Sequence, residues 1–382
     1  MTELNTVLPA LKPFLQTAWQ KSGFEQLSSV QERTFSKILE GKDVIVESPT
    51  GTGKTLAYLL PLLQQINVEV KQIQAVILAP SKELAMQILT EIQAWAASSG
   101  IQSASFIGGA NVKRQVEKLK KHPQIVVGTP GRMLELIKQK KMKMHEVKTI
   151  VLDEGDQLLL PEHSDTVFQI IKTTKRERQL LLFSATLNEA TIQKAREIMN
   201  EPELVLIKEE KALEPVEHIY FVSDARDKIE VLRKLSRIEG IHALVFLNGR
   251  WDLSVLVEKL KYKGISVSAL YRDLNKAERE KAIRLFQNGE VSLLLATDVA
   301  ARGLHIPNIT HVVHFDLADS ISQYIHRSGR TGRLGTHNGK VVSIVTPREE
   351  SQLKKYARER KLELKKKQFV RGNIVDVEKS NR

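Results

Sequence analysis

Short aliphatic runs alternate with longer amphipathic stretches along most of this 382-residue chain, and the whole pattern occurs twice. In the first half the runs cover residues 43–47, 75–80, 103–107, 124–128, 149–153, 180–184 and 203–207. In the second half they cover residues 218–222, 243–247, 266–270, 292–297, 311–315 and 340–346. Repeated strand–helix crossovers of this kind predict mainly parallel sheets with helices on both faces. The predicted fold class is therefore α/β, built as two similar halves.

The chain is too long for one ordinary core and suits two domains. Residues 208–215 are charged and end in proline, which is typical of a linker. We therefore predict a first domain at residues 1–207, a linker at 208–215 and a second domain at 216–364. The last segment, residues 365–382, is rich in lysine and arginine, and we interpret it as a basic tail.

Composition limits the chemistry that the chain can perform. The formal net charge of +13 favours a polyanionic partner, although a basic protein also binds nucleic acid nonspecifically. The absence of cysteine excludes disulfides, thiolate zinc sites and Fe–S clusters. His311 and His314 have no third ligand nearby and are interpreted as structural. With neither a signal-like N-terminus nor a membrane-length apolar run, we expect a cytoplasmic protein that does not bind membranes.

The segment 48–55 follows an apolar run and precedes a helix-like one, so its context is strand, loop and helix. Glycines let backbone N–H groups wrap a polyphosphate, and the helix N-terminus adds a positive dipole. Lys54 would reach the outer phosphates, and the Thr55 hydroxyl would ligate magnesium. The alternative is a Gly/Thr-rich turn with a stray lysine, which the flanking elements disfavour. The candidate phosphate-binding residues are Ser48, Thr50, Gly51, Thr52, Gly53, Lys54 and Thr55.

An acidic pair follows another predicted strand. Asp153 and Glu154 come directly after an aliphatic run, which would place both carboxylates at the C-terminal edge of a parallel sheet. Asp153 is predicted to hold magnesium, partly through water, while Glu154 orients and deprotonates an attacking water. Such a pair alone is usually a solvated turn. Together with the phosphate loop upstream it indicates a nucleotide hydrolase.

Further motifs follow in a fixed order along the chain. They are Gly23-Phe24 with Gln31, Asp153-Glu154-Gly155-Asp156, Ser184-Ala185-Thr186, Ala296-Thr297-Asp298 through Arg302-Gly303, and the segment 326–333 from His326 to Arg333. With the phosphate loop, this set resembles the DEAD-box ATP-dependent RNA helicases of the compact bacterial type over nearly the whole chain. The resemblance implies two tandem RecA-like domains, ATP and Mg²⁺ as cofactors, and RNA as partner.

Nucleotide recognition is expected from both predicted domains. Phe24 offers an aromatic face to a base, and Gln31 carries an amide able to read the adenine N6/N7 edge. A core aromatic residue and a solvated amide are the alternatives. The resemblance adds Asp298 and Gly303 to the nucleotide contacts.

The resemblance also assigns roles in hydrolysis. Arg330 and Arg333 would act as arginine fingers on the triphosphate, so hydrolysis would require domain closure, and His326 belongs to the same motif. Ser184 and Thr186 would hydrogen-bond the acidic motif and relay the nucleotide state. Without the rest of the series, a Ser/Thr strand end would be the simpler interpretation.

Contacts to RNA are implied by the resemblance at both predicted domains. Glycines allow close approach of the backbone, and hydroxyl, amide and basic groups contact phosphates and 2′-hydroxyls without reading bases. RNA binding is thus expected to be independent of sequence. The candidates are Pro80, Lys82, Glu83, Gly108, Gly109, Thr129, Pro130, Arg132, Asn248, Arg250 and Thr297.

Four positions depart from the family pattern. Gly155 replaces an alanine, Gly249 a threonine, Lys276 a glutamine and His305 an aspartate. His305 is the most consequential, since the resemblance places there a carboxylate that accepts hydrogen bonds from the nucleotide sugar. The departures in the second domain, Gly249, Lys276 and His305, motivate an alternative to a full helicase, namely an RNA or RNP clamp with weak ATP turnover.

The predicted function is an RNA-dependent ATPase that locally unwinds short RNA duplexes or remodels RNA–protein complexes. A DNA-directed motor is disfavoured because the motifs resemble those of RNA helicases. Ribosomal RNA or ribosomal precursors, ribosome assembly and cold adaptation are expectations from the family alone. The protein is expected to be a monomer.

Overall fold

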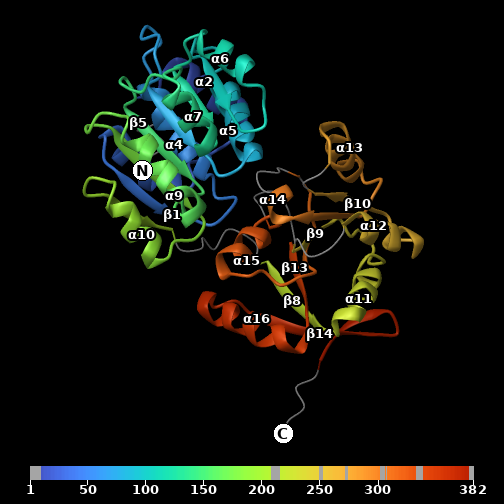
Figure 1. Cartoon of the computed structure of the whole chain (residues 1–382). Coiled ribbons are helices and arrows are strands. Elements are labelled where there is room, and N and C mark those ends of the chain that lie inside the picture. The colour runs from blue at the N-terminus through green and yellow to red at the C-terminus, as the bar shows by residue number, and fades with distance from the viewer. Residues whose placement is uncertain are drawn as a thin grey trace. The chain divides into compact units, whose positions relative to one another are not determined.

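The computed structural model describes residues 10–207, 216–248, 253–271, 274–301, 306, 308–332 and 339–377, without the side chains of Lys276 and Val299. The chain divides into two compact units between Glu209 and Glu210, within the segment that the sequence predicts as a linker. Figure 1 shows the two units. No helix among the described residues combines the length and the apolar character needed to cross a membrane.

The first unit contains a fully parallel seven-stranded sheet in the order β3-β4-β2-β5-β6-β1-β7. Its strands are β1 (Val44–Glu47), β2 (Ala75–Leu78), β3 (Ser103–Phe106), β4 (Ile125–Gly128), β5 (Thr149–Asp153), β6 (Gln179–Ser184) and β7 (Glu203–Leu206). Its helices are α2 (Pro13–Ser22), α3 (Ser29–Leu39), α4 (Lys54–Gln65), α5 (Lys82–Trp95), α6 (Val112–Leu119), α7 (Pro130–Lys138), α8 (Gly155–Leu158), α9 (Pro161–Ile171) and α10 (Glu189–Arg196).

Each face of this sheet is covered by its own set of helices. Val44 and Val46 of β1 pack into a core with α2 to α5, whereas Ile45 between them packs into a second core with α6 to α10. Successive side chains of a strand point to opposite faces, so a strand buried on both faces needs apolar residues at consecutive positions. This requirement explains the short aliphatic runs in the sequence.

The second unit repeats the plan with the order β10-β11-β9-β12-β13-β8-β14-β15. Its strands are β8 (Glu217–Val222), β9 (Ala243–Leu247), β10 (Val267–Leu270), β11 (Leu293–Thr297), β12 (His311–His314), β13 (Lys340–Val345), β14 (Leu364–Val370) and β15 (Asn373–Asp376). Its helices are α11 (Lys228–Leu235), α12 (Leu253–Tyr262), α13 (Lys276–Gln287), α14 (Asp298–Ala301), α15 (Ile321–Ser328) and α16 (Pro347–Arg360), with a 3-10 turn, η2 (Ala225–Asp227). One core includes α11 and α12, and the other includes α13 to α16.

The C-terminal segment differs from the predicted basic tail of residues 365–382. Residues 364–376 form two strands of the second sheet: β14 pairs parallel to β8, and β15 returns antiparallel to β14. Phe369 anchors the hairpin, since its ring stacks on Phe221 with centroids 4.9 Å apart. The second unit therefore continues past residue 364, and residues 378–382 lie outside the described part of the chain.

The lysines of β14 explain why its strand character is hidden in the sequence. Lys365, Lys366 and Lys367 interrupt the apolar pattern, but each has a carboxylate partner. These partners are Glu217 at 3.3 Å, Glu350 at 3.5 Å and Asp376 at 2.7 Å, respectively. The lysines that suggested a basic tail thus form ion pairs with carboxylates of β8, α16 and β15.

Candidate functional site

Residues predicted to bind the nucleotide and residues predicted to bind RNA both lie at the C-terminal edge of the first sheet. All seven strands are parallel, so their C-terminal ends meet at one edge, where ligands of α/β sheets bind. Strands β5, β6 and β1 are neighbours, and the candidate nucleotide residues follow them. Strands β3, β4 and β2 are neighbours as well, and the candidate RNA residues of this unit follow those. The edge is thereby divided into two adjoining halves.

The phosphate loop connects β1 to α4. Gly51 and Gly53 adopt φ values of +82° and +88°, which L side chains rarely adopt. Ser48, which stands where glycine is common, lies with its Oγ 2.6 Å from Oγ1 of Thr52, and Thr52 donates to the Pro49 carbonyl at 2.8 Å. The two hydroxyls therefore brace the loop from within. Thr50 and Gly51 form its outer turn.

Lys54 is the first residue of α4, and its side chain lies back over the loop. Its Nζ donates to the Ser48 carbonyl at 2.6 Å and to the Pro49 carbonyl at 2.7 Å. The ammonium group is thus held at the mouth of the loop, beside the N-terminus of the helix. Backbone N–H groups, a helix N-terminus and a lysine together form the geometry that binds phosphates.

Asp153, at the end of β5, is buried, and both of its carboxylate oxygens accept hydrogen bonds. Its Oδ2 accepts a hydrogen bond from the Tyr58 hydroxyl at 2.8 Å, and its Oδ1 accepts one from the Glu154 N–H at 2.9 Å. Loss of hydration on burial raises the pKa of the Asp153 carboxyl to about 6. Tyr58 also hydrogen-bonds Thr55, so it links the two residues predicted to hold magnesium.

The sequence does not identify Tyr58, because it lies within the apolar run of α4. The one hint in the sequence is a hydroxyl group within an otherwise apolar run. In the structure Tyr58 is completely buried, and a buried hydroxyl normally requires a polar partner. Thr55 and Asp153 supply the oxygen donors that Mg²⁺ prefers, and no cluster of three metal-ligating side chains occurs among the described residues. The site therefore fits an ion whose remaining ligands come from phosphates and water.

Glu154 differs from Asp153 in both conformation and exposure. Its φ of +52° lies in the left-handed region, which is unusual for a residue other than glycine and stores about 1 to 3 kcal/mol of strain. Its side chain is half-buried, whereas that of Asp153 is buried. Of the two carboxylates, Glu154 is therefore the one with access to a water molecule.

Ser184, the last residue of β6, and Thr186, just after it, make the contacts with the acidic motif that the sequence predicts. Ser184 Oγ donates to Asp156 Oδ1 at 2.7 Å, and Thr186 Oγ1 donates to Oδ2 of the same carboxylate at 3.3 Å. All three residues are buried. A shift of the acidic motif would therefore move the end of β6, which is what the predicted relay requires.

Gly155 is the position in the acidic motif that departs from the family pattern. A side chain of the neighbouring strand occupies the space beside it. A Cβ at Gly155 would lie 2.5 Å from Cγ and 2.8 Å from Cδ2 of Leu182, a buried residue of β6. Leu182 thus occupies the space that an alanine methyl group would need. An alanine at position 155, as in the family pattern, would therefore clash with Leu182 unless Leu182 or the backbone moved.

We therefore expect Gly155→Ala to destabilise the protein by about 1 to 3 kcal/mol through overpacking, measured by denaturant unfolding. In a Leu182→Ala background the same change should be neutral or stabilising, because the methyl group partly fills the cavity. Gly131→Ala in α7 is the matched control, since a Cβ there meets no atom within 4 Å. Equal effects of Gly155→Ala and Gly131→Ala would contradict the clash.

Of the two residues predicted to bind the base, Gln31 contacts the phosphate loop. Gln31 Nε2 donates to the Gly53 carbonyl at 3.3 Å, and its Oε1 accepts from the Ser28 N–H at 3.0 Å. Both ends of the amide predicted to read adenine are thus engaged, and Gln31 ties α3 to the phosphate loop. Phe24 is 49% exposed, with its ring centroid 5.8 Å from that of Trp19.

The candidate RNA residues of the first unit form one contiguous group around Gly108 and Gly109. Lys82 lies over this pair, and a Cβ at Gly109 would meet its Nζ at 2.7 Å. The Gly108 N–H donates to Thr129 Oγ1 at 3.3 Å, and Arg132 Nη1 donates to the Ala110 carbonyl at 3.0 Å. The other candidates begin or precede the adjoining helices: Pro80 and Glu83 at α5, and Pro130 at α7.

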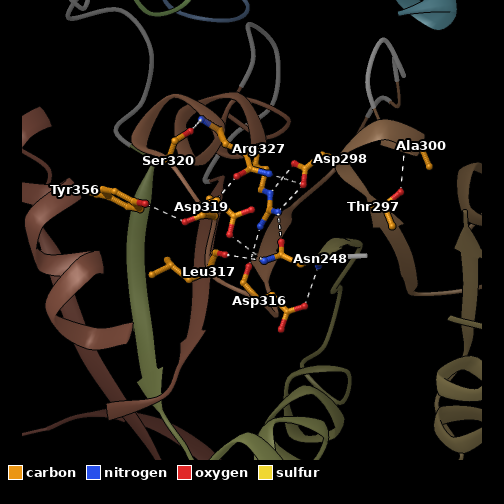
Figure 2. Close-up of polar contacts among 12 residues, drawn as sticks. Asn248, Thr297, Asp298, Ala300, Asp316, Leu317, Asp319, Ser320, Arg327 and Tyr356 are labelled. Carbon is orange, nitrogen blue, oxygen red and sulfur yellow. Dashed lines mark hydrogen bonds and ion pairs between the residues drawn. The ribbon is translucent and has the colours of Figure 1, made fainter. Parts of the chain in front are cut away.

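In the second unit, Arg327 of α15 organises the C-terminal ends of three neighbouring strands (Figure 2). The guanidinium is 1% exposed and binds Asp298 bidentately, with Nε to Oδ1 at 2.7 Å and Nη2 to Oδ2 at 2.6 Å. It also donates to the Asp316 carbonyl at 2.8 Å and to Asn248 Oδ1 at 2.9 Å. One side chain thus joins the ends of β11, β9 and β12.

This arrangement alters the interpretation of two predicted residues. Asp298, assigned to the nucleotide, is committed to Arg327 and also accepts from Gln323 Nε2 at 2.7 Å. Asn248, assigned to RNA, is oriented by the same arginine. Arg327 lies in the motif 326–333, but no role was predicted for it from the sequence. It follows Tyr324, which is buried in the structure, by three positions and therefore lies on the inward face of α15.

Other predicted residues lie nearby or outside the description. Thr297 ends β11 and accepts the Ala300 N–H at 3.3 Å. His326, in α15, and Arg330, just after it, are both half-buried. The predicted residues Arg250, Gly303 and Arg333, and the departures Gly249 and His305, lie outside the described residues, as does the side chain of Lys276.

Comparison with known families gives matches in both units. The DEAD/DEAH box helicase model matches residues 28–195, and the helicase conserved C-terminal domain model matches residues 227–335. The probable ATP-dependent RNA helicase YfmL of Bacillus subtilis is 55% identical over 375 residues, spanning 98% of this chain and 99% of YfmL. The DEAD-box ATP-dependent RNA helicase CshC of Bacillus cereus is 50% identical over 367 residues, spanning 96% and 94% of the two chains.

Solved structures give a similar result. Dbp5 of S. cerevisiae, bound to RNA and ADP BeF3, is 31% identical with a TM-score of 0.84, and the match covers 93% of each chain. Mss116p, bound to ssRNA and AMP-PNP, is 26% identical with a TM-score of 0.83, and the match covers 96% of this chain and 79% of Mss116p.

Proposed function

Because this chain belongs to the DEAD-box family and is an ATP-dependent RNA helicase, we propose that it hydrolyses ATP in an RNA-dependent manner to separate short RNA duplexes or remodel RNA–protein complexes. The observation that carries the proposal is the divided C-terminal edge of the first sheet. The phosphate loop and acidic motif occupy one half, and the basic, glycine-containing group around Lys82 occupies the other.

In the proposed reaction Lys54 binds the outer phosphates, and Thr55 and Asp153 hold the magnesium ion, partly through water. When bound, the magnesium ion would neutralise part of the negative charge of the phosphates. Glu154 orients the attacking water and accepts its proton. Arg330 and Arg333 stabilise the charge that develops on the phosphates, and Ser184 and Thr186 sense the position of the acidic motif through Asp156.

RNA would be held through its backbone. Lys82, Arg132 and Asn248 contact phosphates and 2′-hydroxyls, and Gly108 and Gly109 let the strand approach closely, so no base is read. Domain closure around ATP and RNA would displace one strand of a short duplex. Action on ribosomal precursors, a role in cold adaptation, a monomeric state and a cytoplasmic location stay predictions of the family resemblance.

The test compares steady-state ATP hydrolysis with no nucleic acid, with single-stranded RNA and with DNA of the same sequence, together with strand separation of a short RNA duplex. The proposal predicts strong stimulation by RNA, weak stimulation by DNA and separation that needs ATP. RNA binding with little stimulation would instead support the clamp, which the departures at Gly249, Lys276 and His305 in the second domain motivate. Equal stimulation by DNA would point to a DNA-directed motor.

A further inference from the structure

Helix α12 ends on a side chain that packs against almost nothing. Tyr262 is 94% exposed, far more than any other exposed large hydrophobic residue in the described part of the chain. It stands between Lys261 and Lys263, one turn after Lys259, and all three lysines are exposed. Within the described residues neither Lys259 nor Lys261 forms an ion pair. The fold thus leaves the Tyr262 ring almost unpacked, next to two lysines without an ion pair among the described residues.

Helix α11 extends the positive surface. Both helices pack on the same core, through Leu232 and Leu235 of α11 and Leu256 and Leu260 of α12, and Figure 1 shows them next to one another. Lys234 and Lys263 both lower the pKa of the Glu230 carboxyl, although its hydrogen bond to Arg233 is the main cause. Both lysines therefore lie near a carboxylate whose charge is already paired with Arg233. Lys234 Nζ also lies over the Phe369 ring, 5.6 Å from its centroid.

We call Tyr262, Lys234, Lys259, Lys261 and Lys263 the Tyr262 surface. It lies away from the site described above. Helix α12 connects the C-terminal end of β9 to the N-terminal end of β10, and these strands lie in one parallel sheet. Tyr262 is therefore at the N-terminal edge, whereas Asn248 and Thr297 are at the C-terminal edge. Lys234 lies in the last turn of α11, which leads to the N-terminal end of β9, so Lys234 is at the N-terminal edge as well.

Helix stability accounts for only part of this arrangement. Lysines in the last turn of a helix interact favourably with its dipole, which explains Lys259 and Lys261. It does not explain Tyr262, because an exposed phenol adds nothing to that interaction. A protein partner is also a poor fit, since interfaces are depleted in lysine and only Val255 of the same helix adds exposed apolar surface.

We propose that the Tyr262 surface binds single-stranded RNA that extends beyond the RNA held at the C-terminal edges. A base stacks on the Tyr262 ring while the lysines contact the flanking phosphates. Surfaces for single strands combine these two elements and tolerate any sequence, because every base has a π-face. The inference rests on the proposed function, in that RNA is the substrate.

The test measures binding of a short RNA of about 10 nucleotides and a long RNA of about 40 nucleotides by fluorescence anisotropy, on the full chain. Tyr262→Ala should weaken binding of the long RNA about 5- to 150-fold, and Tyr262→Phe should retain it, because loss of one stacked base has this effect. Replacing Lys259, Lys261 and Lys263 with glutamine should make the salt dependence shallower by about two, since single strands release about 0.7 counterion per contact. Binding of the short RNA should change little.

The matched control replaces Lys138, Lys141 and Lys143, which are exposed at and beyond the end of α7 in the first unit, with glutamine. This variant removes the same charge and should leave the salt slope unchanged. Unchanged binding of the long RNA by Tyr262→Ala, equal losses in Tyr262→Ala and Tyr262→Phe, or an equal effect of the control would overturn the inference. Stimulation of ATP hydrolysis by the short RNA, measured in the same preparations, tests the proposed function separately.

Discussion

Glu154→Gln is expected to bind ATP normally and to hydrolyse it about 10² to 10⁴-fold more slowly, since a positioned general base contributes about this much. The amide keeps the size of the carboxylate but cannot accept the proton of the attacking water. The structure allows this separation of roles. Asp153, not Glu154, is bonded to Tyr58 beside the phosphate loop, while Glu154 is half-buried at the start of α8.

Binding of a fluorescent nucleotide and steady-state ATP hydrolysis at saturating RNA measure the two properties. Lys54→Ala serves as the contrasting variant, because Lys54 lies at the mouth of the phosphate loop and its loss should impair both binding and turnover. Near-normal turnover by purified Glu154→Gln would show that another group activates the water.

Arg327→Met should destabilise the second unit by about 3 to 5 kcal/mol, the usual cost of breaking a buried ion pair by removal of one partner. The change leaves Asp298 without its counter-charge. It also leaves the Asp316 carbonyl and Asn248 Oδ1 without the donors that Arg327 provides. Denaturant unfolding measures the loss, and RNA-stimulated ATP hydrolysis should fall with it, because Asn248 loses its orientation.

Arg233→Met provides the matched control. Arg233 also binds a carboxylate bidentately, that of Glu230, but this pair is far more exposed, and exposed pairs contribute little to stability. Addition of Asp298→Leu to Arg327→Met should recover part of the lost stability, since no unpaired charge is then left. If Arg327→Met is no more destabilising than Arg233→Met, the network around Arg327 does not stabilise the unit.

Local pattern was sufficient for most of the fold. Strands that are buried on both faces must be apolar at consecutive positions, so every aliphatic run marked one strand of the structure. The strands that no run marked are β14 and β15. In β14, Lys365 to Lys367 obscure the pattern because each ammonium group has a carboxylate partner elsewhere in the unit. Nothing local distinguishes lysines that are paired in this way from lysines in a basic tail.

The candidate site divides in a similar way. The phosphate loop and the acidic pair were identified from residue types and the strands before them, because their chemistry is carried by neighbours in the chain. The roles of Tyr58, Leu182 and Arg327 were not predicted, although Arg327 lies within an identified motif, since each residue acts on a partner that is distant in sequence. These partners are Asp153 for Tyr58, Gly155 for Leu182, and Asp298 and Asn248 for Arg327.

Strand order is the physical origin of this difference. Periodicity reports which side chains are buried, but any order of the same strands satisfies it equally well. The order β5-β6-β1 brings the acidic motif, Ser184 and the phosphate loop together, and the order β11-β9-β12 places Asp298, Asn248 and Asp316 around one arginine. Non-local pairing of strands creates these contacts, so they belong to the folded structure and have no counterpart in local sequence.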